Sequence, residues 1–283
     1  MPFRHTLTLT CPDRPGIVHA VSGALLELGG NIVENAQFGD VGTGLFCMRT
    51  EFDAAVGDAD TIAQAVRDRL GDDPSATLHV RTEGDRPRVL IMVSKFDHCL
   101  LDLLYRWLSG ELAVDIPLIV SNHPDAESIA DAYGIRYVHL PVTKETKPAQ
   151  EAALLALVEE HAVDLVVLAR YMQVLSDDLC TKLSGRAINI HHSFLPGFKG
   201  ARPYHQAHER GVKLVGATAH FVTGELDEGP IIEQDVARVD HAHTAAQLTS
   251  LGRDIERMVL SRAVRYWSEN RVLLLGHKTV VFS

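Results

Sequence analysis

Four short apolar runs in the last two thirds of the chain constrain its fold more than any other feature. They cover residues 88–94, 116–121, 164–169 and 187–190. Strands with such nearly continuous apolar composition are buried on both faces, as in parallel sheets that carry helices on either side. The runs therefore predict four strands of one parallel sheet.

Segments with helical periodicity lie between these runs, at residues 100–108, 126–133 and 148–161. The resulting order βαβαβαβ predicts an open, mostly parallel α/β sheet with right-handed crossovers. Such sheets bind ligands beyond the carboxyl ends of their strands, which directs attention to residues 170–174 and to the segment that begins at His191. A capping box at residues 244–247 then opens a long helix through Trp267.

The first third of the chain shows a different pattern. Residues 4–11 alternate polar and apolar side chains, as a half-buried strand does. Asp13, Pro15 and Gly16 then mark the start of a helix that ends before Gly29. Two strands, a second helix and a last strand follow, at residues 31–39, 44–53, 62–70 and 76–81. The order βαββαβ predicts a ferredoxin-like unit.

The two patterns indicate two domains. A chain of 283 residues has room for two, at roughly 100 to 200 residues each. Residues 83–87 are polar, contain Gly and Pro and lack periodicity, as linkers between domains do. We therefore predict a first domain over residues 1–84 and a second over residues 85–283.

Composition and charge narrow the class of partners. Apolar residues make up 46% of the chain, the formal net charge is -10, and no basic run interrupts the acidic background. Nucleic acid and anionic membranes are therefore not expected partners. The sequence lacks the roughly 18 consecutive apolar residues that a membrane span needs. The four cysteines form no CxxC pair, so we expect reduced thiols and a cytoplasmic protein.

Polar side chains collect where the last apolar run ends. The sequence AINIHHSFLP places Asn189 and His191 on one face of the strand and His192 on the other, unless the strand has already ended. An acidic, turn-rich loop at residues 223–230 follows, and from it we choose Asp227 as a third partner. These three side chains are the candidate catalytic group.

An amide, an imidazole and a carboxylate suit chemistry at a carbonyl carbon that passes through a tetrahedral intermediate. Asn189 can donate a hydrogen bond to the developing oxyanion, and His191 can donate or shuttle a proton. Asp227 can hold the imidazole or orient and deprotonate an attacking nucleophile. On residue pattern alone, Asn189 and His191 can also be read as structural hydrogen-bonding groups at a strand end.

A metal site is the main chemical alternative, because the chain has 15 histidines. The pairs are His191 with His192 and His205 with His208. Adjacent histidines on a strand point apart, no HExxH motif is present, and the second pair has no nearby carboxylate at ligand spacing. We therefore predict no metal.

The segment from Leu168 to Val236 resembles the 10-formyltetrahydrofolate-dependent formyltransferases. The resemblance rests on LARYMQVLS, AINIHHSFLPGFKGARPYHQAHERGVKLVGATAHFV and ELDEGPIIEQDV. Within that group, the doubled histidine, the run GARPYHQAHERGVK and the preceding unit are similar to the formyltetrahydrofolate deformylases. The N-terminal TCPDRPGIVHAVSGALLELGGNIVE resembles an ACT domain. Together these resemblances imply an ACT domain followed by a Rossmann-like formyltransferase domain.

The resemblance implies that Asn189, His191 and Asp227 are catalytic, and that folate is the substrate, with no further cofactor. It also implies a folate wall from the loop after the third apolar run and from the backbone after the histidine strand. The residues implied are Arg170, Met172, Val174, Leu175, Val222 and Thr223. Many relatives carry a basic residue where this chain has Gln173, so an ion pair to folate from that position is not expected.

The acceptor of the formyl group is expected to be water. Transformylases that act on phosphorylated amines resemble one another in a Gly-rich turn after the first strand, whose amides cradle the phosphate. Residues 93–99 of this chain contain no glycine. Hydrolysis of 10-formyltetrahydrofolate to formate and tetrahydrofolate is therefore the expected reaction. The alternatives are a formyltransferase with another amine acceptor and a non-catalytic effector sensor.

The N-terminal unit has two expected roles. ACT domains in relatives bind small effectors such as amino acids at interfaces between copies, and the resemblance points to Asp13, Gly16 and Asn31. A unit of about 84 residues has a modest core and open sheet edges, so we also expect a homo-oligomer. On the alternative view, Asp13 only caps the helix and Gly16 only turns the chain.

Overall fold

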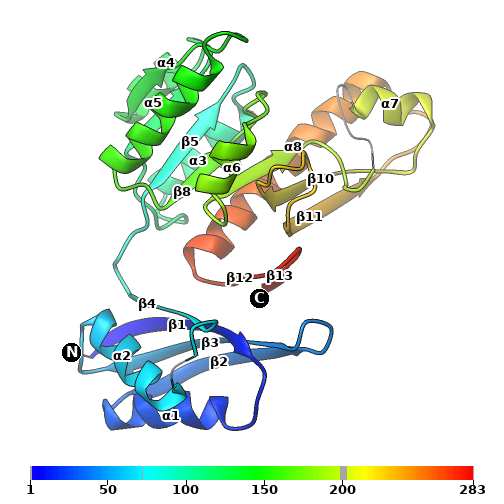
Figure 1. Cartoon of the computed structure of the whole chain (residues 1–283). Coiled ribbons are helices and arrows are strands. Elements are labelled where there is room, and N and C mark those ends of the chain that lie inside the picture. Colours follow the sequence, from blue (N-terminus) through cyan, green and yellow to red (C-terminus); the bar gives the residue numbers. More distant parts are fainter. Residues whose placement is uncertain (1, 72, 198–202, 283) are drawn as a thin grey trace. The chain divides into compact units, whose positions relative to one another are not determined.

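The computed structural model describes residues 2–71, 73–197 and 203–282 (Figure 1). Residues 198–202, part of the segment that carries the resemblance, lie outside the described residues. The chain forms two compact units, Met1–Asp85 with Glu269–Ser283, and Arg86–Ser268. Each unit is described by itself.

The first unit contains the predicted βαββαβ order. Its elements are β1 (Phe3–Pro12), α1 (Ile17–Glu27), β2 (Asn31–Asp40), β3 (Leu45–Ala54), α2 (Ala59–Leu70) and β4 (Thr77–Thr82). The antiparallel sheet has the strand order β2-β3-β1-β4. Alternate residues of β1, such as Leu7 and Leu9, pack with Val21 of α1 and Ile62 of α2 in one apolar core. This confirms the ferredoxin-like unit.

Helix α1 begins later than the sequence pattern predicts. The residue before its first turn is Gly16, which has a φ of 94° and caps the helix without a side-chain hydrogen bond. Pro15 therefore lies outside the helix, and Asp13 does not cap it. The left-handed backbone at residue 16, which glycine adopts readily, turns the chain from β1 into α1.

The last fifteen residues correct the predicted domain boundary. Strands β12 (Val272–Leu275) and β13 (Lys278–Val281) form a hairpin that belongs to the first unit, whereas we predicted one domain over residues 85–283. The physical reason is apolar burial: Leu273, Leu275 and Phe282 pack against Cys47 of β3.

Leu275→Ala should lower the free energy of unfolding by about 2 to 5 kcal/mol, because it leaves a cavity where a leucine packs on β3. Leu275 is 1% exposed and its neighbour Leu274 is 39% exposed, so Leu274→Ala is the matched control. Urea unfolding followed by circular dichroism measures both variants. Equal destabilisation by the two substitutions would show that the hairpin is not packed as described.

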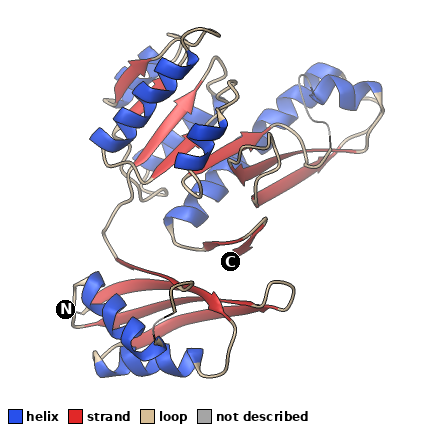
Figure 2. Cartoon of the chain, in the orientation of Figure 1, coloured by secondary structure: helices blue, strands red, loops and turns tan. Residues whose placement is uncertain are grey.

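The second unit holds a seven-stranded sheet with helices on both faces (Figure 2). Its elements are β5 (Val89–Val93), α3 (His98–Leu108), β6 (Leu118–Ser121), α4 (Glu127–Tyr133), β7 (Arg136–His139), α5 (Lys147–Glu160), β8 (Leu165–Leu168), α6 (Asp177–Lys182), β9 (Ala187–His191), α7 (Pro203–Glu209), β10 (Leu214–Phe221), β11 (Ile231–Arg238) and α8 (Ala245–Ser268). The strand order is β11-β10-β9-β8-β5-β6-β7. The five strands from β9 to β7 are parallel, and β10 and β11 are antiparallel.

The four predicted strands β5, β6, β8 and β9 are confirmed, and their residues are almost all buried. Leu90 and Met92 of β5 pack against Leu154 of α5. Strand β7 and helices α6 and α7 were not predicted, because they are only four to seven residues long and carry little periodic signal. No helix in the described part of the chain is long and apolar enough to cross a membrane.

The strand order predicts a ligand crevice at the carboxyl ends of β5 and β8. The loop after β8 is the one that the family resemblance implies in folate binding. After β5 the chain moves to β6 on one side of it and later returns to β8 on the other side, so the order reverses between β5 and β8. Crevices form beyond the carboxyl ends of strands at such switch points. Here the two ends are joined, because Ser94 N donates to Arg170 O at 3.3 Å and Met172 N donates to Ser94 Oγ at 2.9 Å.

Candidate active site

The pairing of β9 with β10 assembles the polar end of the sheet. Asn189 of β9 lies opposite His220 of β10 in the antiparallel register, and β9 ends at His191. The acidic loop that follows β10 returns Asp227 to this edge. Two strands and one loop therefore bring a set of polar side chains together at one place.

The three predicted catalytic side chains lie in contact distance of one another or of a shared neighbour. His191 Nδ1 lies 3.2 Å from Asp227 Oδ1. Asn189 Nδ2 lies 3.2 Å from His220 Nε2, which is 3.8 Å from the same carboxylate oxygen. The group is therefore one connected polar cluster with His220 as its fourth member.

His220 orients the amide of Asn189. Its Nδ1 donates to the carbonyl oxygen of Phe221 at 2.8 Å. Burial lowers the pKa of His220, which favours the neutral ring. In that tautomer Nε2 accepts a hydrogen bond from Asn189, which leaves the second N–H of the amide for a ligand. His220 is not among the predicted site residues, although a histidine near the end of an apolar strand is the same signal that identified His191.

Asp227 is held as a carboxylate. Burial alone would raise the pKa of Asp227, but the hydrogen bond from His191 lowers it below its ordinary value. The residue has a φ of 59°, so the loop places it in the left-handed region that non-glycine residues seldom adopt. On the other side of the imidazole, His191 Nε2 is buried and has no hydrogen-bond partner among the described residues.

A cavity of about 400 Å³ opens at this cluster. It is lined by all three predicted catalytic residues and by every residue of the implied folate wall, namely Arg170, Met172, Val174, Leu175, Val222 and Thr223. Met172 and Val174 are exposed, so they do not serve as ordinary core residues. Leu175 and Val222 pack partly against the core of the sheet. The cavity has the apolar walls and few convergent polar groups that are typical of small-molecule sites.

His192 lies beside His191, which is the case we allowed for a strand that has already ended. Their ring centroids are 5.1 Å apart, and both rings line the cavity. Alternation does not apply, because β9 has ended at His191. Burial, followed by the charge of Arg170, lowers the pKa of His192 to about 4.

Among the residues that the structure describes, one group of side chains has ligand atoms close enough to share a metal ion. His98, Cys99 and Glu256 present atoms within 4.8 Å of one another. Burial raises the pKa of the Cys99 thiol well above its usual range, and the Arg170 guanidinium lies 3.4 Å from the Glu256 carboxylate. A protonated thiol and an adjacent cation both disfavour a divalent ion. His205 and His208 of α7 are exposed.

Comparisons with known proteins agree with this architecture. Residues 87–264 match the formyl transferase family, and residues 5–69 match the ACT domain family. The chain is 52% identical to a formyltetrahydrofolate deformylase from Corynebacterium sp. (strain P-1), over 98% of each chain. These matches confirm the two resemblances that the sequence carries.

Solved structures show the same relationship. The crystal structure of formyltetrahydrofolate deformylase from Burkholderia mallei is similar over 100% of both chains, with a TM-score of 0.94 and 50% identity. Glycinamide ribonucleotide transformylase 1 from Symbiobacterium toebii is similar over 71% of this chain and 97% of its own, with a TM-score of 0.67 and 29% identity. The chain therefore belongs to the formyltetrahydrofolate deformylase family, with an ACT domain before its formyl transferase domain.

Proposed function

We propose that Asn189, His191 and Asp227 carry out the hydrolysis of 10-formyltetrahydrofolate to formate and tetrahydrofolate. The observation that carries this assignment is the contact of His191 with Asp227, 3.2 Å apart, in the wall of a 400 Å³ cavity that also includes Asn189. Membership of the deformylase family supplies the reaction. The three side chains supply an oxyanion donor, a proton donor and a base.

In the proposed mechanism, the carboxylate of Asp227 orients a water molecule and accepts one of its protons. The water oxygen forms a bond to the formyl carbon, and the formyl oxygen becomes an oxyanion. The free N–H of Asn189 and an N–H at Nε2 of His191 donate hydrogen bonds to that oxygen. The bond from carbon to the folate nitrogen then breaks, the nitrogen takes up a proton through the cluster, and formate leaves.

The direct test is formate release from 10-formyltetrahydrofolate by the chelator-treated protein, without any amine. Hydrolysis should proceed under these conditions, since the three side chains supply acid, base and oxyanion contact without a Lewis acid. Activity that requires added zinc would indicate instead that the histidines bind a catalytic metal ion. Formylated product that appears only with an amine would instead identify a transferase.

Asn189→Ala should lower kcat by about 100-fold to 1000-fold, which corresponds to loss of one oxyanion donor of about 2.7 to 4 kcal/mol. The Michaelis constant should change little, because the contact strengthens only as charge develops on the formyl oxygen. Steady-state formate release measures both constants. A change confined to the Michaelis constant would make Asn189 a binding residue.

For the ACT domain we propose an amino-acid effector near Asp13, Gly16 and Asn31. Asp13 and Gly16 lie in the connection from β1 to α1, and Asn31 begins β2. Helix α1 begins without a side-chain cap, so its first N–H groups can receive a carboxylate. The test adds the common amino acids singly to the full chain and to Asp13→Ala, and records turnover and melting temperature. If no amino acid changes either quantity, the domain is better explained as an assembly device.

We further propose that the chain forms a homo-oligomer through its ACT domain. Strand β2 is an edge of the sheet and exposes Ile32, Val33 and Phe38. Edge strands with exposed apolar side chains pair readily with a second copy. Light scattering should give a mass above that of one chain, and Val33→Lys should lower it. A monomeric wild-type protein would contradict the proposal.

A further inference from the structure

A buried ionic cluster lies beside the catalytic group. At its centre is Glu256 of α8, which is 1% exposed. Its carboxylate accepts hydrogen bonds from Tyr204 Oη and His98 Nε2, each at 2.8 Å, and lies 3.4 Å from Arg170 Nε. Four charged or polar side chains from α3, α7, α8 and the loop after β8 thus meet in a largely buried place, where His98 is the most exposed at 13%. We call these four residues the Glu256 cluster.

The Glu256 cluster is poorly explained as a device for stability. The Arg170 side chain is more than nine-tenths buried, yet its Nε and Nη1 make no hydrogen bond to any described residue. Arg170 Nε is therefore close enough to the Glu256 carboxylate for an ion pair, but its N–H does not point at an oxygen as a hydrogen bond requires. Arg170 also has a φ of 64°, which is costly for a residue with a side chain. Buried polar networks in which some donors have no acceptor lower the stability of the folded protein. Apolar residues of similar volume often give equal or greater stability at such positions.

The Glu256 cluster is connected by side-chain contacts to the catalytic cavity, which we call the formyl site. Arg170 and His191 line the same cavity. The His192 ring contacts His191 on one side and Tyr204 on the other, with ring centroids 5.1 Å and 6.4 Å apart. The hydroxyl of Tyr204 then reaches Glu256. A chain of direct contacts therefore connects the catalytic histidine to the cluster.

The loop after β5 lies against the Arg170 side of the Glu256 cluster. The loop after β5 supplies Phe96, and the Arg170 guanidinium carbon lies 5.5 Å from the centre of its ring. His98 begins α3 directly after this loop. In the transformylases that this fold resembles, the corresponding turn cradles the phosphate of the amine acceptor. Here that turn supplies Phe96 and His98, which contact Arg170 and Glu256, and Arg170 in turn lines the catalytic cavity.

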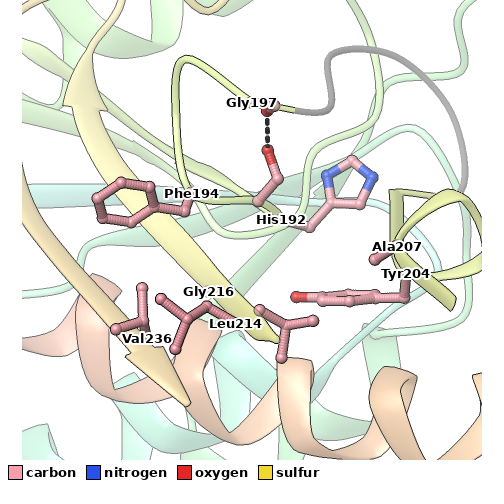
Figure 3. Close-up of a pocket in the computed structure, with 10 residues that line it drawn as sticks. His192, Phe194, Gly197, Tyr204, Ala207, Leu214, Gly216 and Val236 are labelled. Carbon is pink, nitrogen blue, oxygen red and sulfur yellow. Dashed lines mark hydrogen bonds between the residues drawn. The ribbon is translucent and has the colours of Figure 1, made fainter. Parts of the chain in front are cut away.

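Tyr204 is held against α8 by a close approach at Gly252. A Cβ atom at this position would lie 2.0 Å from Tyr204 Cζ, so only glycine permits the contact. Figure 3 shows Tyr204 and His192 on one side of a separate cavity of about 330 Å³, with Phe194 and Val236 on the other side. That cavity is apolar and does not include Asn189, His191 or Asp227 among its lining residues. Tyr204, a member of the Glu256 cluster, therefore lines this second cavity together with His192.

We propose that the Glu256 cluster, covered by Phe96, fills the acceptor side of the formyl site and thereby restricts the attacking nucleophile to water. The inference rests on the deformylase function proposed above and assigns its specificity. Water can reach the formyl carbon without a binding pocket of its own. A primary amine must bring its substituent through the space that these side chains occupy.

The test opens this space and measures which nucleophile takes the formyl group. Arg170→Gly removes the side chain and suits the left-handed backbone at that residue, and Glu256→Gln in the same variant avoids an unpaired buried charge. In transfer, the amine nitrogen bonds to the formyl carbon and loses a proton. The bond to the folate nitrogen breaks, and that nitrogen gains a proton. With glycinamide or hydroxylamine in excess, the ratio of N-formyl amine to formate should rise roughly 10-fold to 200-fold over wild type.

Arg253→Ala is the matched control, because Arg253 lies 5.5 Å from the same Phe96 ring but is exposed and outside the Glu256 cluster. Its product ratio should equal that of wild type. Gly252→Ala is a second variant, which keeps both charges, favours the helix and displaces Tyr204 from Glu256. Its ratio should also rise. The ratio does not depend on total activity, so a structural loss alone would not move it.

Two results would overturn the proposal. One is a folded Arg170→Gly/Glu256→Gln or Gly252→Ala variant with the wild-type product ratio. The other needs no variant: wild-type protein that formylates glycinamide as fast as it releases formate already has an open acceptor side. Failure of the deformylase function itself is distinguished by the reaction without amine, in which wild-type protein would then release no formate.

Discussion

Asp227→Asn should lower kcat by about 100-fold to 10,000-fold while the protein remains folded. The amide keeps the shape of the side chain but cannot accept a proton from water, and it removes the negative charge beside His191. The lowered pKa of Asp227 means that the wild-type group is a carboxylate at neutral pH, so the substitution changes the charge of the working enzyme. Formate release measures turnover, and circular dichroism measures folding.

The control for this substitution is Glu228→Gln, which removes the same charge from the next position of the same loop. Glu228 is exposed, and it is not among the residues that line the catalytic cavity. Its turnover should stay within about threefold of wild type, as is usual for surface substitutions away from a site. A folded Asp227→Asn variant that retained more than about a tenth of the wild-type rate would exclude Asp227 as the base.

His191→Ala should lower kcat by a similar factor, about 100-fold to 10,000-fold, because the proton donor is lost and Asp227 loses its partner. His191 is buried at the end of β9, and its Nε2 has no acceptor or donor among the described residues. That unused atom is the one we expect to act on the substrate. Added imidazole should restore part of the rate of His191→Ala, since the substitution leaves space of the right shape.

The double variant distinguishes a cooperative group from two independent effects. Residues that act as a unit are strongly non-additive, so His191→Ala with Asp227→Asn should cost little more than either substitution alone. Losses that multiply would indicate that the two side chains act in separate steps. Imidazole should not rescue the double variant, because the base is also missing.

Local patterns in the sequence determined the strands, the order of most elements and the choice of catalytic residues. The apolar runs became β5, β6, β8 and β9, because burial on both faces requires apolar side chains at consecutive positions. Alternation along β9 placed Asn189 and His191 on one face while the strand lasted. The family resemblance named the folate wall residue by residue, and all six line one cavity.

Tertiary structure decided what depends on partners far apart in the chain. The register of β9 with β10 places His220 opposite Asn189. Because β9 ends at His191, the alternation of side chains along the strand does not extend to His192, which lies beside His191. The last fifteen residues pack on the first unit because their apolar side chains find an uncovered face of the sheet there. Arg170 and Glu256 form an ion pair although 86 positions separate them in the sequence. Local periodicity does not extend over such a separation, so it could not predict this pair. Strand register and buried ion pairs arise only from packing, which is why the sequence could point to the candidate catalytic side chains but not to the side chains that orient and enclose them.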